Sequence, residues 1–327
     1  MRYLITGGAG FIGSHLSETL INAGHAVTIL DDFSTGRFEN LAHIDGHPLL
    51  TIIKGDVREQ RLVEEAVKDS DSVYHLASAV GVQLVVDRPV HTIDTIVHGT
   101  ATVLEACSRY RRPVLITSTS EVYGKATKMP FSENDDSITG PPSTRRWCYA
   151  CAKALDEFLA LAHWHECRLP VVLVRLFNTV GPRQTGQYGM VIPNFIRQAL
   201  KNEPIRVFGD GAQSRCFCHV KDVVRALTGL LGPRETRGEL FNVGSSNEIS
   251  IRDLAERIRD YTGSSSEIIT IPYEEAYGEG FEDMQRRVPD ISKINKAIGF
   301  TPELTLDDII RDCVQYVSES LALNVRC

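Results

Sequence analysis

The sequence predicts an α/β protein built around a doubly wound parallel β-sheet. In the first half of the 327-residue chain, short runs rich in β-branched residues alternate with longer stretches of helical periodicity. That alternation is typical of parallel strands joined by crossover helices. The short runs are apolar throughout rather than alternately polar and apolar, so we expect helices to cover both faces of the sheet.

The strands and helices of this first part follow one another in a regular order. The predicted strands, each a short apolar run, are residues 2–6, 25–30, 49–54, 72–76, 113–117 and 171–176. The predicted helices between them, each with apolar residues at helical spacing, are residues 11–23, 60–68, 91–110 and 149–167. Leu169 and Pro170 end the last helix, because proline cannot continue a helix.

The alternation loosens after residue 176. Helices are predicted there at residues 192–201, 221–230, 251–261 and 306–320, and short strands at residues 205–208, 240–243 and 267–271. We therefore expect a sheet domain over residues 1–175 and a smaller C-terminal α/β lobe over residues 176–327. The two units are expected to exchange segments.

The composition favours an ordinary globular protein without a nucleic-acid or membrane partner. A net charge of −7 and a pI near 5.8 disfavour a surface built to bind nucleic acid or anionic lipid. No apolar run approaches the length of a membrane span, and the N-terminus lacks the features of a signal peptide. Eight cysteines in so long a chain do not make a disulfide framework. These observations predict a cytoplasmic location with reduced cysteines.

A glycine-rich turn joins the first predicted strand to the first helix. It reads Thr-Gly-Gly-Ala-Gly-Phe-Ile-Gly over residues 6–13. The glycines let the backbone turn tightly and approach a pyrophosphate, while the helix N-terminus offers unpaired N–H groups to the phosphates. This pattern indicates the dinucleotide-binding turn of a Rossmann-type sheet. The residues expected to contact the dinucleotide here are Gly7, Gly10, Phe11, Ile12 and Gly13.

Two acidic residues, Asp31 and Asp32, end the second predicted strand, and Asp31 lies eighteen residues past Gly13 (31 − 13). An acidic side chain at this place accepts hydrogen bonds from the adenosine ribose and repels a 2′-phosphate. The sequence therefore predicts NAD rather than NADP as the cofactor.

Two further strand ends are candidate contacts of the same cofactor. Asp56 and Val57 follow the third strand, and Asp56 could hydrogen-bond the adenine edge. Leu76 and Ala77 follow the fourth strand and could line the dinucleotide. Both pairs also fit as ordinary residues of strand-end loops, and the sequence leaves these alternatives open.

Tyr149 and Lys153 stand four residues apart on one predicted helix, so they share a helix face. A nearby ammonium favours the phenolate, which could make Tyr149 a base near neutral pH. Thr119, Ser120 and Glu121 follow the strand predicted to end at residue 117. Polar side chains at that place can reach a ligand at the carboxyl edge of the sheet.

Together these motifs resemble the extended short-chain dehydrogenases/reductases, in the branch that epimerises, dehydrates or decarboxylates nucleotide sugars. The resemblance covers essentially the whole chain. It implies that Tyr149 takes the proton of a sugar 4-hydroxyl while hydride passes from C4 to NAD. It also implies that Lys153 lowers the pKa of Tyr149 and holds the nicotinamide ribose, and that Thr119 places a hydroxyl beside the phenol.

The same resemblance implies residues for the nucleotide sugar and a quaternary structure. Leu-Phe-Asn-Thr-Val-Gly-Pro-Arg over residues 176–183 resembles a segment whose asparagine contacts the nucleotide diphosphate, which makes Asn178 and Arg183 candidate substrate residues. Arg215 resembles an arginine with the same role. The family forms homodimers through a four-helix bundle, which implies contacts through the helices at residues 91–110 and 149–167.

Within the branch, the strand end at residues 118–124 resembles UDP-glucuronate decarboxylases. Residues 146–149 and 277–283 also resemble members of that group, and Arg287 corresponds to an arginine that contacts the sugar or its carboxylate. The expected reaction is decarboxylation of UDP-glucuronate to UDP-xylose or its 4-keto pentose. We hypothesise that Glu121 orients the sugar or relays a proton near C5. Ser120 is a poor proton donor, which disfavours 4,6-dehydration.

Other functions remain open at this point. UDP-sugar 4-epimerisation is the first alternative, followed by dehydration of a nucleotide hexose and by net oxidation with release of NADH. A module that only binds NAD is a non-enzymatic alternative, and the presence of both Tyr149 and Lys153 disfavours it. No metal is expected, because Cys148 and Cys151 bracket Tyr149 and no second cysteine pair of zinc-ribbon spacing follows.

Overall fold

The computed structural model describes residues 1–79, 81–186, 190–273, 275 and 284–324. Its centre is a seven-stranded sheet in the order β11-β6-β5-β4-β1-β2-β3, in which every neighbouring pair is parallel. The strands are β1 (Arg2–Thr6), β2 (Ala26–Asp31), β3 (Leu50–Lys54), β4 (Ser72–His75), β5 (Val114–Thr119), β6 (Val171–Leu176) and β11 (Glu239–Val243). The chain runs outward from β1 to β3 and then restarts at β4 on the other side of β1. Ligands of such sheets bind at this switch point, beyond the carboxyl ends of the strands.

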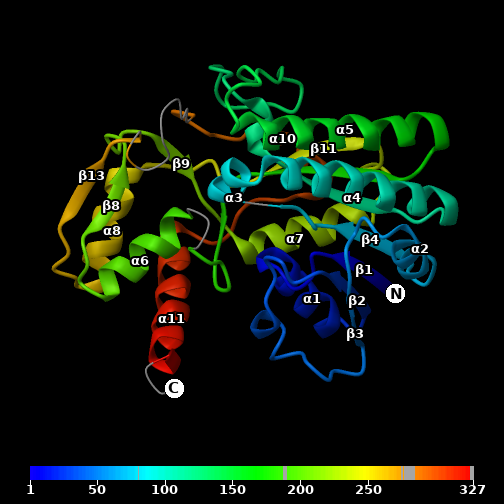
Figure 1. Ribbon diagram of the computed structural model, residues 1–327, viewed down its shortest axis with the longest axis horizontal. Coiled ribbons are helices and arrows are strands. Elements are labelled where there is room, and N and C mark those ends of the chain that lie inside the picture. The colour runs from blue at the N-terminus through cyan, green and yellow to red at the C-terminus, as the bar shows by residue number, and fades with distance from the viewer. Residues whose placement is uncertain (80, 187–189, 274, 276–283, 325–327) are drawn as a thin grey trace.

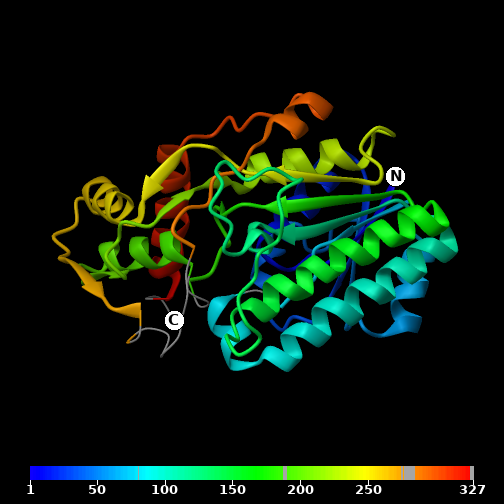
Figure 2. The same ribbon diagram turned by 90° about the horizontal axis from the view of Figure 1, so that it is seen from above.

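Helices cover both faces of the sheet, as the apolar strands require (Figure 2). Neighbouring strand residues point to opposite faces: Leu4 packs with one set of helices and Ile5 with the other, and both are fully buried. One face carries α1 (Phe11–Asn22) and α7 (Val220–Leu231); the other carries α2 (Gln60–Lys68), α4 (Pro89–Tyr110) and α5 (Trp147–Cys167). The predicted α/β class with a doubly wound parallel sheet is confirmed.

A second group of elements lies beyond the carboxyl edge of the sheet (Figure 1). It has its own apolar cluster and consists of α6 (Val191–Leu200), β8 (Ile205–Phe208), α8 (Ile251–Thr262), β13 (Ile268–Ile271) and α11 (Leu306–Asn324). Strand β11 and helix α7 also come from the second half of the chain, yet they belong to the sheet and its covering layer.

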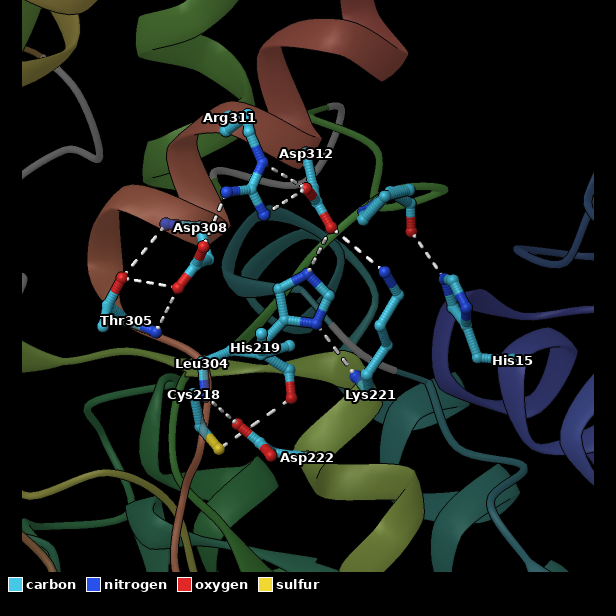
Figure 3. Close-up of polar contacts among 11 residues, drawn as sticks. His15, Cys218, His219, Lys221, Asp222, Leu304, Thr305, Asp308, Arg311 and Asp312 are labelled. Atoms are coloured by element: carbon cyan, nitrogen blue, oxygen red, sulfur yellow. Dashed lines mark hydrogen bonds and ion pairs between the residues drawn. The ribbon is translucent and has the colours of Figure 1, made fainter.

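A buried histidine ties the C-terminal helix to the centre of the molecule (Figure 3). His219 ends the short strand β10 (Cys218–His219), and its Nδ1 accepts a hydrogen bond of 3.0 Å from the backbone of Lys221 at the start of α7. Its Nε2 lies 3.4 Å from Asp312 of α11, and Lys221 Nζ lies 3.1 Å from the same carboxylate. Burial lowers the pKa of His219. These contacts hold α11 against the start of α7.

All the predicted strands and helices are present, with ends that differ by a few residues. The sequence analysis missed elements too short for periodicity to reveal. They are α3 (Val82–Asp87), α10 (Ser292–Ile298), the 3-10 turns η1 (Phe38–Asn40) and η2 (Ser120–Tyr123), and the strands β7 (Thr179–Val180), β9 (Ser214–Cys216), β10 and β12 (Glu248–Ser250). Among the described residues, no helix is long and apolar enough to cross a bilayer.

Candidate functional site

A cavity of about 1060 Å³ lies at the carboxyl ends of the parallel strands. It extends from the glycine-rich turn after β1 to the second group of elements around α6 and β8. Ligand pockets of proteins usually measure about 300–1,000 Å³. This cavity is therefore large enough to hold a dinucleotide together with a second ligand.

The glycine-rich turn forms one end of this cavity, and its backbone leaves no room for side chains. Gly7 has a φ of +71°, which favours glycine. A Cβ at Gly13 would lie 2.2 Å from the Gly7 carbonyl oxygen. Gly10 caps α1 without a side-chain hydrogen bond, so the first N–H groups of the helix stay open toward the cavity. The five predicted contacts of the turn all line the cavity.

We predict that Gly13→Ala weakens dinucleotide binding at least tenfold and destabilises the fold by about 1–3 kcal/mol. The added methyl group would collide with backbone atoms of the turn, which cannot move aside as a flexible side chain can. Calorimetric NAD titration and thermal unfolding measure the two effects. Gly232→Ala is the matched control, because a Cβ there meets nothing within 4 Å. Normal NAD affinity in Gly13→Ala would contradict this account of the turn.

Asp31 closes the far side of the turn at the end of β2. Its carboxylate accepts hydrogen bonds from the backbone of Ala9 at 2.9 Å and of Phe33 at 2.8 Å, and burial raises its pKa. Asp32 beside it is exposed, and its Oδ1 accepts a hydrogen bond of 2.8 Å from the Ser34 backbone. Both residues line the cavity. The two carboxyl groups at this end of the cavity would repel the 2′-phosphate of NADP.

The two other predicted strand ends also reach the cavity. Val57, Leu76 and Ala77 line it. Asp56 lines it too, but its carboxylate is held by Arg58, whose Nε donates a 3.0 Å hydrogen bond, and this contact lowers the pKa of Asp56. The ion pair between Asp56 and Arg58 therefore holds the loop after β3 in place without a ligand.

Tyr149 and Lys153 project from the first two turns of α5 into the middle of the cavity. Lys153 Nζ donates a hydrogen bond of 3.0 Å to the Thr117 carbonyl oxygen and lies 3.2 Å from Asp156. Burial raises the pKa of Tyr149, Glu121 raises it further, and a hydrogen bond with Thr119 lowers it. Burial is thus the largest influence on this pKa in the structure, and the ammonium of Lys153 is paired with Asp156. The effect of Lys153 on the Tyr149 pKa stays a prediction.

Glu121 lies beside two arginines in the same cavity as the phenol of Tyr149. Its Oε1 lies 3.6 Å from Arg146 Nη2 and 3.4 Å from Arg287 Nη1, and all three side chains are at least four-fifths buried. The Arg146 guanidinium also lies 5.7 Å from the centre of the Trp147 ring. Two guanidinium groups therefore converge on one carboxylate in this part of the cavity.

Ser120 and Thr119 complete the middle of the site. Thr119 ends β5, and its hydroxyl accepts a hydrogen bond of 3.2 Å from the Glu121 backbone, which fixes the short turn that follows. Ser120 is the first residue of that turn, is 1% exposed and lines the cavity. The structure thus brings together all five predicted catalytic residues.

The predicted substrate residues occupy two different places. Asn178 and Arg215 line the cavity toward β9; Asn178 Nδ2 donates a hydrogen bond of 2.9 Å to the Cys216 carbonyl, and Arg215 Nη1 donates one of 2.7 Å to the Ser214 carbonyl. Arg183 lies instead against α1, with its Nη2 2.7 Å from Glu18 Oε2. Its guanidinium therefore sits beside the glycine-rich turn rather than beside Tyr149.

The sequence analysis missed two residues of the site. Arg146 carries part of the resemblance at residues 146–149, but the sequence analysis predicts no role for it, and Asp156 shares no motif with the other site residues. The spacing of Asp156 could have revealed it, because residues 149, 153 and 156 lie on the same face of a helix. Residues 277–283, which carried part of the predicted resemblance, lie outside the described residues.

The part of the chain that the structure describes holds no group of three or more potential metal ligands. Cys148 and Cys151 are both free thiols. The site is therefore built from a phenol, ammonium and guanidinium groups, hydroxyls and carboxylates.

Comparisons with known proteins agree with this geometry. A family model described as GDP-mannose 4,6 dehydratase matches residues 4–313. A UDP-N-acetyl-alpha-D-glucosaminuronate decarboxylase of Bacillus cytotoxicus is 41% identical over 319 residues, which cover 97% of this chain and 98% of the relative. UDP-glucuronic acid decarboxylase 1 of Xenopus tropicalis is 36% identical over 320 residues, which cover 98% of this chain and 73% of the relative.

Solved structures give the same result for the fold. A UDP-glucose 4-epimerase of Thermotoga maritima with UDP-glucose superposes with a TM-score of 0.88 at 28% identity, covering 98% of this chain and 100% of the other. A dTDP-glucose 4,6-dehydratase of Bacillus anthracis in complex with NAD gives 0.86 at 26% identity, covering 98% and 97%.

Proposed function

The chain belongs to the extended short-chain dehydrogenases/reductases, in the family that the GDP-mannose 4,6-dehydratase model describes, and on this premise we propose that it decarboxylates a UDP-linked uronic acid. UDP-glucuronate is the proposed substrate, and UDP-xylose or its 4-keto pentose the product. One observation carries the proposal: Arg146 and Arg287 converge on Glu121 in the cavity that holds Tyr149. Two guanidinium groups beside the reacting phenol suit a substrate with a carboxylate.

The residues of the cavity fit NAD as the cofactor. The backbone at Gly7 and Gly13 is packed too closely to admit a Cβ, and the open N-terminus of α1 suits a pyrophosphate. The residues proposed to hold NAD are Gly7, Gly10, Phe11, Ile12, Gly13, Asp31, Asp32, Asp56, Val57, Leu76, Ala77 and Lys153. Solved relatives of this chain were crystallised with NAD. When bound, NAD would supply the acceptor for the hydride of sugar C4 and the donor for its return.

The chain's own residues then move protons and hold the sugar. Tyr149 accepts the proton of the 4-hydroxyl, and the Thr119 hydroxyl holds the phenol in place by a hydrogen bond. Arg287 and Arg146 hold the C6 carboxylate, with Glu121 placing the two guanidinium groups. Asn178 and Arg215 are proposed to hold the diphosphate, and Arg183 to brace the glycine-rich turn through Glu18.

Decarboxylation follows from the position of the carboxylate relative to the oxidised carbon. With C4 a ketone, the C5–C6 bond breaks, CO₂ leaves, and the electron pair moves into the C4 oxygen. The Tyr149 hydroxyl donates a hydrogen bond to that oxygen and stabilises its charge. C5 then regains a proton, for which Glu121 and Ser120 are the proposed relay. Return of the hydride to C4 would give UDP-xylose with no net oxidation, whereas release of the 4-keto pentose would leave the hydride on the cofactor as NADH.

The 4-epimerisation of a UDP-sugar is the second candidate for the same site. It shares the oxidation at C4, and solved epimerases match this fold over nearly the whole chain. Epimerisation does not need a carboxylate on the substrate, so it does not account for the two arginines that converge on Glu121. Dehydration would need a proton donor where Ser120 stands.

Product mass after incubation with UDP-glucuronate separates these functions. The purified protein, supplied with NAD, is incubated with UDP-glucuronate, UDP-N-acetylglucosaminuronate or UDP-glucose. Loss of CO₂ from a uronate supports the proposal, and the preferred uronate identifies the sugar. An isomer of equal mass would establish an epimerase, and loss of water a dehydratase. NADH that accumulates together with loss of CO₂ would identify the 4-keto pentose as the product, and NADH without loss of CO₂ would indicate a net oxidoreductase. NAD binding without turnover of any sugar would indicate a binding module.

A homodimer through α4 and α5 is the proposed quaternary structure. These helices lie side by side and expose large apolar side chains: Val90 is 80% exposed, Leu155 50% and Phe158 74%. Apolar residues gathered on one helix pair are typical of a subunit interface. The same pair on a second copy would complete a four-helix bundle.

We predict that Phe158→Glu converts the dimer into a monomer at micromolar concentration, because it places a charge in the apolar interface. Sedimentation velocity measures the change in mass. Tyr261→Glu is the control, since Tyr261 is also exposed but lies on α8. A wild-type monomer, or an intact dimer of Phe158→Glu, would disprove this interface.

We further propose that residues 1–175 form the NAD-binding domain and residues 176–327 the nucleotide-sugar lobe, with β11 and α7 contributed by the second part to the first. A cytoplasmic location is proposed from the free thiols of the described cysteines.

A further inference from the structure

Asp156 on α5 is a buried acid whose partner is the central lysine of the site. Its side chain is 1% exposed, and its Oδ2 lies 3.2 Å from Lys153 Nζ, which is itself 3% exposed. The lysine makes a second contact, the 3.0 Å hydrogen bond to the Thr117 carbonyl oxygen. Lys153 is therefore fixed by two groups of the protein, and one of them carries a negative charge.

Besides Lys153, Asp156 interacts with the side chain of Thr100 on α4, whereas the link from α5 to the sheet comes from another carboxylate. The neighbouring Glu157 already supplies the buried carboxylate that joins α5 to the sheet, through a 2.5 Å hydrogen bond from Ser118 and an ion pair of 2.6 Å with Arg175. Other buried positions on α5 near Asp156 are alanines, Ala152 and Ala160. Burial raises the pKa of Asp156, and the charge of Lys153 opposes that shift. A buried carboxylate is costly unless it is paired, so its pairing with Lys153 indicates a role at the site.

The helix places the acid in line with the reacting phenol. Tyr149, Lys153 and Asp156 are spaced four and three residues apart, which puts them on one stripe of α5. Asp156 lies about 10 Å along the helix axis from Tyr149, with the lysine between them. Its negative charge is one of the causes that raise the pKa of Tyr149.

We propose that Asp156 is a positioning residue for the reaction: it anchors the Lys153 ammonium, offsets part of its charge, and thereby sets the pH at which Tyr149 becomes a base. The inference rests on the proposed role of Tyr149 as the base. It adds that the strength of this base is tuned by a residue that does not touch the sugar. Other charged and titratable groups around this row of residues are Glu121, Arg146, Arg287, His75, Glu157 and Arg175.

The sign of the effect follows from the charges. An anion near Tyr149 disfavours the phenolate, so removing the charge of Asp156 lowers the pKa of Tyr149. The base form is then present at lower pH. For two charges about 10 Å apart, the expected shift is on the order of one pH unit. A substitution that only loosened the packing would lower the rate at all pH values and leave the midpoint in place.

The test compares Asp156→Asn with the wild-type enzyme saturated with NAD. The Tyr149 Cζ resonance of isotope-labelled protein is titrated with pH and identified by its absence in Tyr149→Phe. In parallel, kcat/KM is measured against pH with UDP-glucuronate. We expect both midpoints to fall by about one pH unit in Asp156→Asn. Asp156→Glu, which retains the charge, should restore the wild-type midpoint, and Glu166→Gln at the exposed end of α5 should leave it unchanged.

A Tyr149 midpoint in Asp156→Asn that equals or exceeds the wild-type value would overturn the proposal. So would a Tyr149 that ionises in neither protein within the pH range of the native fold. Thermal unfolding checks that the variant is folded, and Asp156→Ser is the second neutral variant if Asp156→Asn is not. A shifted resonance in a protein that releases no CO₂ from any uronate would sustain this inference while refuting the proposed function.

Discussion

Tyr149→Phe is expected to reduce kcat for CO₂ release about 1,000-fold, the usual contribution of a positioned acid–base group. The substitution keeps the ring and removes only the hydroxyl, so the packing at the start of α5 should persist. What is lost is the group proposed to take the proton from the 4-hydroxyl and then to stabilise the charge on the C4 oxygen. Because the residues proposed to hold NAD include the glycine-rich turn and Asp31, which this substitution leaves intact, the affinity for NAD should change little.

Stopped-flow measurement of the first turnover with UDP-glucuronate tests this expectation. A defect at the oxidation step appears as slow formation of bound NADH, whereas a defect later in the reaction leaves that step fast. Tyr261→Phe, on the exposed face of α8, is the matched control and should be unaffected. Retention of more than about a tenth of the wild-type kcat by Tyr149→Phe would assign the proton transfer to another group.

The sequence predicted those parts of the site that depend on local patterns. The glycine-rich turn, the acidic end of β2 and the four-residue spacing of Tyr149 and Lys153 are each encoded within a few residues. Parallel strands bring their carboxyl ends to one edge of the sheet, so Thr119 could be placed near the helix that carries Tyr149 without a structure.

Contacts between distant parts of the chain could not be predicted in this way. Arg183 lines the cavity and pairs with Glu18, 165 residues earlier, which holds its guanidinium beside the glycine-rich turn. Strand β11 joins the sheet beside β6, although the surrounding sequence belongs to the second lobe. No local pattern distinguishes such pairings from ordinary surface charges or short strands.

The electrostatics of the phenol also required the structure. The Tyr-x-x-x-Lys spacing suggested a lysine acting on a tyrosine, but it contains no information about burial or about other partners of the lysine. The structure adds Asp156 to Lys153 and Glu121 to the surroundings of Tyr149, and both raise the pKa that the lysine was expected to lower. Sequence patterns identify the groups of a site more readily than the balance of charge among them.

Arg287→Gln is expected to lower kcat/KM for UDP-glucuronate about 100-fold or more, because removing one partner of a buried charge pair costs about 2–5 kcal/mol. Arg287 lies 3.4 Å from Glu121, lines the cavity, and is proposed to hold the substrate carboxylate. Glutamine keeps a polar group of similar reach but has no positive charge and cannot donate two parallel hydrogen bonds to a carboxylate.

Arg286→Gln is a closely matched control for this variant. Arg286 is the adjacent residue, but its guanidinium makes two 2.8 Å hydrogen bonds to Glu248 and its side chain is 56% exposed. Its loss should leave CO₂ release unchanged. The neutral sugar nucleotide UDP-glucose gives a second comparison: Arg287→Gln should bind it as the wild type does, since it has no carboxylate. Equal weakening for the uronate and the neutral sugar would mean that Arg287 holds the nucleotide or the fold, and the uronate specificity would then have to come from Arg146.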